Sequence, residues 1–103
     1  MIETVYNTSG KVVNRGAIGD IIEKDKDTID NIIQYQFIQK SKVNYMIKLV
    51  VKESFKNENF IHTQFIKLLG YNAHIKFDYV DAIEPLPSGK RPVIINQSFS
   101  KAA

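Results

Sequence analysis

Residues 32–51 read IIQYQFIQKSKVNYMIKLVV, and this stretch decides the fold. In its first half, apolar residues alternate with glutamines, a period of two that is typical of a β-strand. The second half repeats the alternation, and Lys40-Ser41-Lys42 lies between the halves as a turn. The apolar side of the two strands comprises Ile33, Tyr35, Phe37, Val43, Tyr45, Ile47, Leu49 and Val51. The stretch therefore predicts an antiparallel hairpin.

Glutamines form the polar side of the first strand. Gln34, Gln36 and Gln39 fall near or on the side opposite the apolar residues. Such a row could bind a ligand, but alternating polar residues are first of all a side that faces solvent or another domain. We therefore expect a polar surface here.

Beyond the hairpin, the spacing of apolar residues changes to that of a helix. The stripe is Ile61, Phe65, Leu68 and Leu69, at i, i+4, i+7 and i+8. Asn57 or Asn59 is a candidate N-terminal cap, and Gly70 is a C-terminal stop. Strict alternation then returns, which predicts a third strand in the same sheet as the hairpin. Its apolar members are Ala73, Ile75, Phe77 and Tyr79.

Upstream of the hairpin, the sequence indicates a ribbon and a helix. Asn7-Thr8-Ser9-Gly10 is a turn-rich tetrapeptide between short β-type pieces, which predicts a small β-ribbon. From Asn14, a candidate cap, apolar residues recur at helical spacing, and Lys24-Asp25-Lys26-Asp27 ends the pattern. The apolar positions are Ala17, Ile18, Ile21 and Ile22.

The C-terminal part completes the predicted fold. Residues 85–92 contain three prolines and cannot hold a regular β-ladder, whereas Val93-Ile94-Ile95 predicts a last short strand. The predicted class is α+β: a small three-stranded sheet with helices packed on it, plus a short N-terminal β-ribbon. A length of 103 residues gives room for one domain, residues 1–103.

The composition narrows the choice of partners. The net charge is +3, from 14 basic and 11 acidic residues that are mixed along the chain. A surface for nucleic acid or anionic lipid needs Lys and Arg concentrated on one face, so we expect neither nucleic acid nor membrane as a partner. The apolar stretches are too short to span a bilayer, and cysteine is absent, as is common in a reducing compartment. We expect a cytoplasmic protein.

Ser88-Gly89-Lys90-Arg91 is the stretch that indicates chemistry most directly. Glycine lets the backbone approach a ligand closely, and a lysine ammonium delivers positive charge to a phosphate or carboxylate oxygen. A Gly-Lys pair by itself is most often a solvated turn. The interpretation therefore depends on the surrounding sequence.

That surrounding sequence resembles a known family. Ile83-Glu84-Pro85, followed by Ser-Gly-Lys-Arg, is similar to the last motif of adenylate-forming ligases, in which a proline-containing strand exit leads into Ser-Gly-Lys. Residues 33–39 resemble the Tyr-Gln-x-x-Gln strand of the phenylacetate-CoA ligase and CapK-like branch, and Val80-Asp81-Ala82-Ile83 resembles the strand before its loop. The resemblance covers residues 9–97 and only the C-terminal lid domain of a longer family.

The resemblance implies roles for particular residues. Lys90 matches the family's catalytic lysine, which reaches the ATP α-phosphate and the acyl carboxylate. The other residues of the loop near the nucleotide phosphates are Ser88, Gly89 and Arg91. Gly10 and Lys11 look like the end of the hinge motif, where a glycine turn follows the pivot. The Gly-Arg-x-x-Asp that opens this motif is absent, so we expect the chain to start just beyond the pivot.

The resemblance also implies cofactors and a partner. The parent enzyme would join a carboxylate to ATP, with Mg²⁺, and pass the acyl group to a thiol such as coenzyme A. The ATP-cradling loop and the acyl pocket have no counterpart in the 103 residues. We therefore expect no cofactor to be bound by this chain alone, and adenylation to need an N-terminal adenylation domain, in the same chain or as a separate subunit. An isolated domain could form a homodimer through the surface left bare.

Other functions stay open from the sequence. A small basic sheet with Tyr and Phe could stack RNA bases, although Tyr35, Phe37 and Tyr45 share their faces with aliphatic residues. A free-standing regulatory module that docks on a protein partner is the other alternative. His62 and His74 have no Cys or carboxylate at ligand spacing, so no metal site is predicted.

Overall fold

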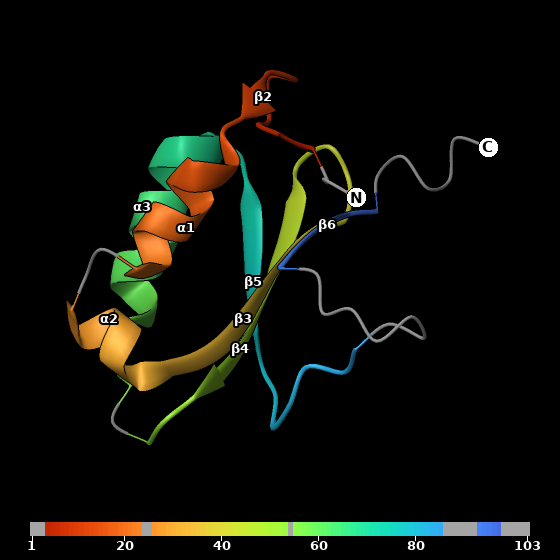
Figure 1. The fold of residues 1–103 in the computed structure, drawn as a ribbon. Helices are drawn as coiled ribbons and strands as arrows, with labels where there is room; N and C mark the ends of the chain where they lie inside the picture. Colours follow the sequence, from red (N-terminus) through yellow and green to blue (C-terminus); the bar gives the residue numbers. More distant parts are fainter. Residues whose placement is uncertain (1–3, 24–25, 54, 86–92, 98–103) are drawn as a thin grey trace.

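The computed structural model describes residues 4–23, 26–53, 55–85 and 93–97, and the predicted α+β class is confirmed. Its elements are β1 (Val5–Tyr6), β2 (Val12–Val13), α1 (Arg15–Glu23), α2 (Lys26–Asn31), β3 (Ile32–Gln39), β4 (Asn44–Val51), α3 (Glu58–Leu69), β5 (His74–Tyr79) and β6 (Ile94–Asn96). Strands β1 and β2 form a ribbon, and the other four form one sheet in the order β5-β4-β3-β6. The helices lie on one side of this sheet (Figure 1).

The predicted hairpin is the centre of the sheet. Strands β3 and β4 are antiparallel and adjacent, with Phe37 opposite Ile47 and Tyr35 opposite Leu49. The apolar side chains of both strands share the face that the helices cover, because side chains at alternate positions point to the same side. The period-two pattern thus placed the apolar residues of this face correctly, except Ile33.

Ile33 is that exception. The ladder shifts between Ile32 and Gln34, so that one residue of β3 is left without a partner on β4. This irregularity turns Ile33 outward, where 61% of its surface is exposed, and Ile32 packs against the core in its place. A bulge of this kind changes which side chain faces inward without changing the sequence pattern. The prediction for Ile33 was therefore wrong.

Helix α3 connects two parallel neighbours in the sheet. It follows β4 and precedes β5, which lies beside β4 with Tyr45 opposite Ile75 and Ile47 opposite Phe77. The helix ends at Gly70, whose N–H donates to the carbonyl of Ile66. This confirms the predicted helix and third strand.

The sheet has four strands, one more than predicted. Strand β6 runs parallel to β3, with Phe37 opposite Ile94, and the Phe37 N–H donates to the Val93 carbonyl at 2.7 Å. A strand of three residues is too short to show a period, and its partner lies more than 50 residues away in the sequence. The sequence therefore predicted the strand but not its place.

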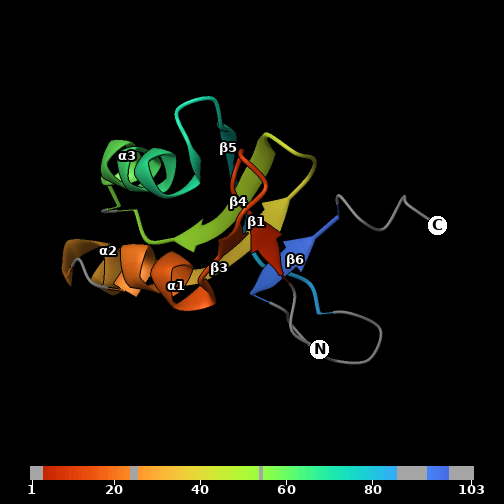
Figure 2. The same cartoon turned by 90° about the horizontal axis from the view of Figure 1, so that it is seen from above.

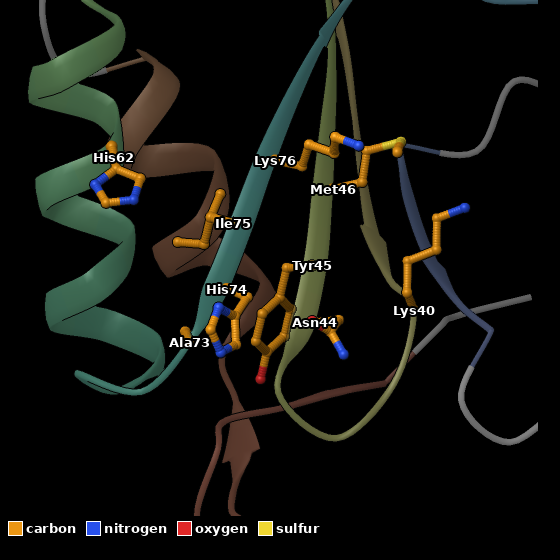
Figure 3. Close-up of a pocket in the computed structure, with 9 residues that line it drawn as sticks. All are labelled: Lys40, Asn44, Tyr45, Met46, His62, Ala73, His74, Ile75 and Lys76. Atoms are coloured by element: carbon orange, nitrogen blue, oxygen red, sulfur yellow. The ribbon is translucent and has the colours of Figure 1, made fainter.

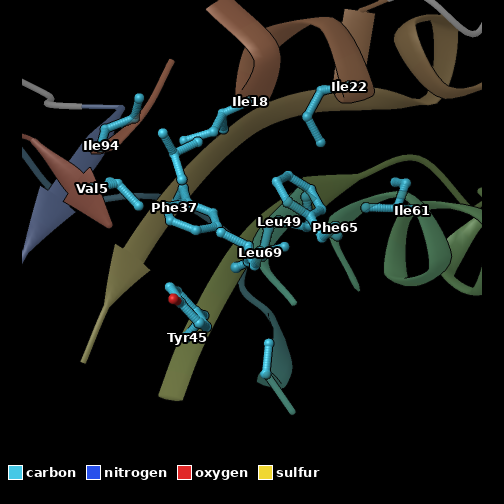
Figure 4. Close-up of a cluster of buried hydrophobic side chains, with 13 residues drawn as sticks. Val5, Ile18, Ile22, Phe37, Tyr45, Leu49, Ile61, Phe65, Leu69 and Ile94 are labelled. Atoms are coloured by element: carbon cyan, nitrogen blue, oxygen red, sulfur yellow. The ribbon is translucent and has the colours of Figure 1, made fainter. Parts of the chain in front are cut away.

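The core fills the space between the sheet and the helices (Figure 4). Phe37 lies at its centre, with its ring stacked on Phe65 at 5.4 Å and tilted against Tyr45 at 5.7 Å between centroids. Helix α1 contributes Ile18 and Ile22 from above the same face. Burial of each such side chain contributes about 1.5 to 3 kcal/mol. One continuous cluster thus joins both layers.

A second short helix lies where the sequence indicated only the end of a helix. Helix α2 begins at Lys26 and leads directly into β3. Thr28 is fully buried, and its hydroxyl accepts a hydrogen bond from the Asn57 amide at 3.1 Å. Asn57 is the N-terminal cap residue of α3 but makes no side-chain cap bond; its side-chain NH2 donates to Thr28 of α2. The charged residues Lys24-Asp25-Lys26-Asp27 indicated the end of a helix, so α2 was not predicted.

The N-terminal ribbon packs on the end of α3. Its turn places Gly10 at φ +87°, a left-handed conformation that glycine adopts without steric cost. The Thr8 N–H donates to the Leu69 carbonyl at 2.9 Å, which brings the ribbon against Gly70. Gly70 has φ +131°, and a Cβ at this position would lie 2.2 Å from the Thr8 hydroxyl oxygen. Ribbon and helix therefore meet at a point where only glycine fits.

Substitutions of Gly10 and Gly70 distinguish the cost of a left-handed backbone from the added cost of the close contact with Thr8. Gly10→Ala meets open space, so only its left-handed φ counts, and we expect a loss of about 1 to 2 kcal/mol in unfolding free energy. Gly70→Ala adds the clash with Thr8, and we expect a loss of about 3 kcal/mol. Denaturant unfolding measures both. Adding Thr8→Ala should recover part of the second loss and none of the first; equal losses for the two glycines would contradict the packing described.

Candidate functional site

The predicted lysine loop lies outside the described residues, but both of its attachments are described. Ser88, Gly89, Lys90 and Arg91 all fall between residues 85 and 93. On one side, the Val80 N–H donates to the Leu49 carbonyl at 2.9 Å, and on the other side Val93 is bonded to Phe37. The segment is thus held to the sheet at its two ends.

This connection joins opposite edges of the sheet. Strand β5 is one edge and β6 is the other. Helices cover one face, and residues 80–85 lie on the other, the open face (Figure 1). Ile83 is buried, as are Ile38 and Val50, although none of the three belongs to the core under the helices. The connection therefore starts out over the open face.

The predicted hinge-proximal residues lie in the ribbon turn. The Asn7 side-chain carbonyl accepts hydrogen bonds from the N–H groups of Ser9 and Lys11 at 3.0 and 2.9 Å. Gly10 N–H donates to the Asn7 carbonyl at 2.9 Å. Lys11 itself is exposed. The turn is thus a compact unit with its own hydrogen bonds, placed on the end of α3.

Buried polar side chains of the sheet fix the chain just before this turn. Gln39 is 2% exposed, and its side-chain carbonyl accepts from the Tyr6 N–H at 2.9 Å and from the Asn96 amide at 3.2 Å. The Asn96 amide also donates to the Thr4 carbonyl at 2.6 Å, and the Tyr45 hydroxyl donates to the Tyr6 carbonyl at 2.7 Å. We call Gln39, Tyr45 and Asn96 the N-terminal clamp.

The clamp brings the two predicted functional segments onto one support. Strand β1 lies beside β6, as Figure 2 shows, and Asn96 of β6 is bonded to Thr4. The ribbon with Gly10 and the strand that follows the lysine loop therefore cannot move independently without breaking buried hydrogen bonds. Such bonds are costly to break because the freed groups lose access to water.

Gln39 does not lie on the polar side of β3, where the sequence placed it. It shares the helix-covered side with Phe37, and its polar groups are satisfied inside the protein. Gln36 is on the open face, as predicted, but it is also buried. The row of glutamines is thus not a continuous solvent-facing surface.

Replacement of the clamp glutamine should destabilise the domain. Gln39→Leu keeps the volume of the side chain but leaves the buried Tyr6 N–H without its acceptor, so we expect a loss of about 1 to 3 kcal/mol in unfolding free energy. Exchange of the Tyr6 amide hydrogen should quicken as well. Gln64→Leu on α3 is the matched control. A Tyr6 amide that exchanges as slowly as in the unchanged chain would rule out the bond.

A pocket of about 440 Å³ lies around the first half of β5 (Figure 3). His62 and Ile75 line its helix side. Its polar lining on the open face comes from the β3–β4 turn, β4 and β5: Lys40, Asn44, His74 and Lys76. Sequence analysis did not bring these residues together, because the register of three strands decides which of them are neighbours. The signal in the sequence that could have found these residues is that they are polar and lie at outward positions of predicted strands or next to them.

Tyr79 ends β5 close to where the connection begins. Its hydroxyl donates a hydrogen bond to the Glu58 carboxylate at the start of α3. Burial, with this hydrogen bond and the Glu58 charge as further causes, raises the pKa of Tyr79 well above its usual value. Burial also raises the pKa of Tyr45, the clamp tyrosine. Both phenols therefore stabilise the fold in their neutral form.

These shifts predict a loss of stability in alkali. A folded-state pKa above the unfolded value of about 10 leaves the contribution complete below pH 10 and removes it as the pH rises further. Tyr79→Phe cannot ionise at this position, so its stability should fall less between pH 9 and 11.5 than that of the unchanged chain. Denaturant unfolding across this range measures the difference. Tyr71→Phe, at an exposed tyrosine, is the control; parallel pH profiles for Tyr79→Phe and the unchanged chain would contradict the assignment.

The other candidate groups have ordinary surroundings. His62 lies beside the Phe77 ring at 6.3 Å, and His74 is exposed. Within the described residues, no group of three or more His, Cys, Asp or Glu side chains could hold a metal ion. No helix in the described part of the chain is long and apolar enough to cross a membrane.

The aromatic residues of the sheet do not form an RNA-stacking surface. Phe37 and Tyr45 are buried in the core, and Tyr35 is half-buried against it on the same face. Recognition of single-stranded RNA on a sheet needs aromatic rings that are open to bases. The helices occupy that space here, so these three residues are structural.

Fold and site together define a small α+β domain with a mixed sheet, one helix-covered face and a long connection that starts across the other face. The family model of the CapK C-terminal domain matches residues 5–97, and the chain belongs to this family. The match begins at β1 and ends just after β6, so it includes every element of the fold. Comparison with curated proteins and with solved structures found no match in either set.

Proposed function

We propose that this domain is the lid of an adenylate-forming ligase of the phenylacetate-CoA ligase and CapK-like branch. Membership of the CapK C-terminal domain family is the observation that carries the proposal. The Ser-Gly-Lys-Arg sequence at residues 88–91 supports it, since it falls in the connection between β5 and β6. The domain would act together with an N-terminal adenylation domain.

Lys90 supplies the chemistry in this proposal. When a carboxylate attacks ATP, negative charge builds up on the α-phosphate and the attacking oxygens. An ammonium delivered there lowers the energy of the transition state more than that of the bound substrates. Gly89 gives the loop freedom to approach, and Ser88 and Arg91 add a hydroxyl and a second positive charge beside the phosphates. ATP would bring Mg²⁺ with it, and coenzyme A or another thiol would accept the acyl group.

The clamp suits a lid that turns as one body. Gly10 and Lys11 are the hinge-proximal residues in this proposal, and Gln39, Tyr45 and Asn96 bond residues 4–6, at the start of the same ribbon, to the sheet. A rotation at the pivot would therefore carry Gly10, Lys11 and the lysine loop together. Such a movement would withdraw the lysine after adenylation and open the site to the thiol.

The role of Lys90 can be tested in the protein that joins this domain to its adenylation domain. Lys90→Ala should lower acyl-adenylate formation, measured by pyrophosphate exchange, by about 100- to 1,000-fold, since it removes a charge that acts in the transition state. Transfer of the acyl group from a preformed acyl-adenylate to the thiol should change little, because that step does not use the lysine.

Lys67→Ala, at an exposed position of α3, is the control for loss of one positive charge. It should leave both half-reactions unchanged. Unchanged pyrophosphate exchange in Lys90→Ala would remove the proposed role, and equal loss in both half-reactions would point to a fault in folding or docking instead. Arg91→Ala, with the same measurements, tests whether the second basic residue contributes.

A further inference from the structure

The open face of the sheet is covered at one end and exposed at the other. Ile38 and Val50 are only 3% and 9% exposed although no described helix lies over them. Ile83, in the connection that starts at Val80, is buried as well. The end of the same face near the β3–β4 turn is different, because its polar side chains are exposed. These are Lys40, Asn44, His74 and Lys76, here named the basic corner.

Strand register brings the basic corner together. Asn44 lies opposite His74, and the Lys40 N–H donates to the Asn44 carbonyl at 2.8 Å, so these three residues form one row across the sheet. Lys76 lies in the next row, opposite Met46. Side chains directly opposite each other in a sheet have Cβ atoms about 5 Å apart. The four residues therefore occupy neighbouring positions on one face of the sheet, and Figure 3 shows Lys40, Asn44 and Lys76 directed away from the helix.

The basic corner contains no compensating negative charge. Among the described residues that line the pocket, none is acidic. The carboxylate nearest in sequence on this face, Asp78, lies one row further along, opposite Lys48. Lys40 and Lys76 lie on opposite sides of β4, one row apart, and an anion placed between their ammonium groups would be attracted by both. The Asn44 amide, held by the Ser41 hydroxyl at 2.7 Å, adds a fixed polar group.

The pocket also has apolar surface and sufficient size. Met46 lies on the open face beside Lys76, whereas Ile75 lines the helix side. The volume of the whole pocket, about 440 Å³, is in the range of small-molecule sites. A ligand that carries phosphate together with an apolar or aromatic part would use both kinds of surface. A bare anion would use only the charged part.

We propose that the basic corner is a binding site for a phosphate-bearing small molecule, held by Lys40 and Lys76 with Asn44 and His74 as further donors. The site lies on the open face, apart from the Ser-Gly-Lys-Arg sequence, and it does not depend on the ligase proposal. It differs from the expectation that this chain alone binds no cofactor. The shared chemistry is a pyrophosphate group, which nucleoside triphosphates and phosphorylated coenzymes both carry.

The test is a titration of the 103-residue chain with inorganic pyrophosphate, followed by amide chemical shifts in ¹H–¹⁵N spectra. We expect saturable shifts centred on Asn44 and residues 74–76, which weaken as salt is added because the site is exposed. ATP and coenzyme A are then titrated in separate arms. Tighter binding of one than of pyrophosphate identifies the source of the phosphate group.

Matched substitutions locate the site. Lys40→Gln and Lys76→Gln each remove one charge from an exposed side chain, so the fold should be kept, and each should weaken pyrophosphate binding by about three- to tenfold. The double variant should show no saturable shift. Lys67→Gln on α3 is the control and should bind as the unchanged chain does.

Three results would overturn the proposal. The first is the absence of saturable shifts at millimolar pyrophosphate, and the second is an equal loss of binding in the Lys67 control. The third is binding of a single-stranded RNA oligonucleotide through the same amides without any response to pyrophosphate, ATP or coenzyme A, which would make this face a nucleic-acid surface. Because pyrophosphate exchange by the joined protein tests Lys90 separately, failure of one proposal leaves the other standing.

Discussion

The buried side chain of Gln39 is the interaction on which the arrangement of this domain depends. It lies on the core side of a central strand, where a polar group is costly unless it is hydrogen-bonded. Its hydrogen bonds are made to the N-terminal strand, to β6 and to the turn after β3. One amide therefore joins the first, middle and last parts of the described chain. Apolar packing around Phe37 supplies most of the stability, but it would tolerate other positions of the N-terminal segment.

The hydrogen bonds of Gln39 bear on the functional proposal because they hold the first and last parts of the described chain together. The segment that would lead in from an adenylation domain and the strand that follows the lysine loop are adjacent, although they are far apart in the sequence. A domain that delivers one side chain into a site built elsewhere needs a short and stiff route from pivot to lysine. Hydrogen bonds in the interior provide stiffness that surface contacts do not, because water cannot replace them.

Much of the fold was predictable because its signals are local. Alternation predicted β3, β4 and β5, and helical spacing predicted α1 and α3. Features that depend on distant partners were not predictable: the place of β6 in the sheet, the outward turn of Ile33 and the burial of Gln39. The lysine loop was found through its resemblance to a family rather than through geometry. The basic corner needed the register of three strands, which a single sequence does not contain.

The two edges of the sheet are closed to further strands in different ways. At one edge, β6 has only three residues and β1 lies against it, so little free backbone remains for pairing. At the other edge, β5 alternates His74, Lys76 and Asp78 with its inward residues, and charged groups along a rim discourage a second chain from adding there. Association between copies by continuation of the sheet is therefore disfavoured at both edges.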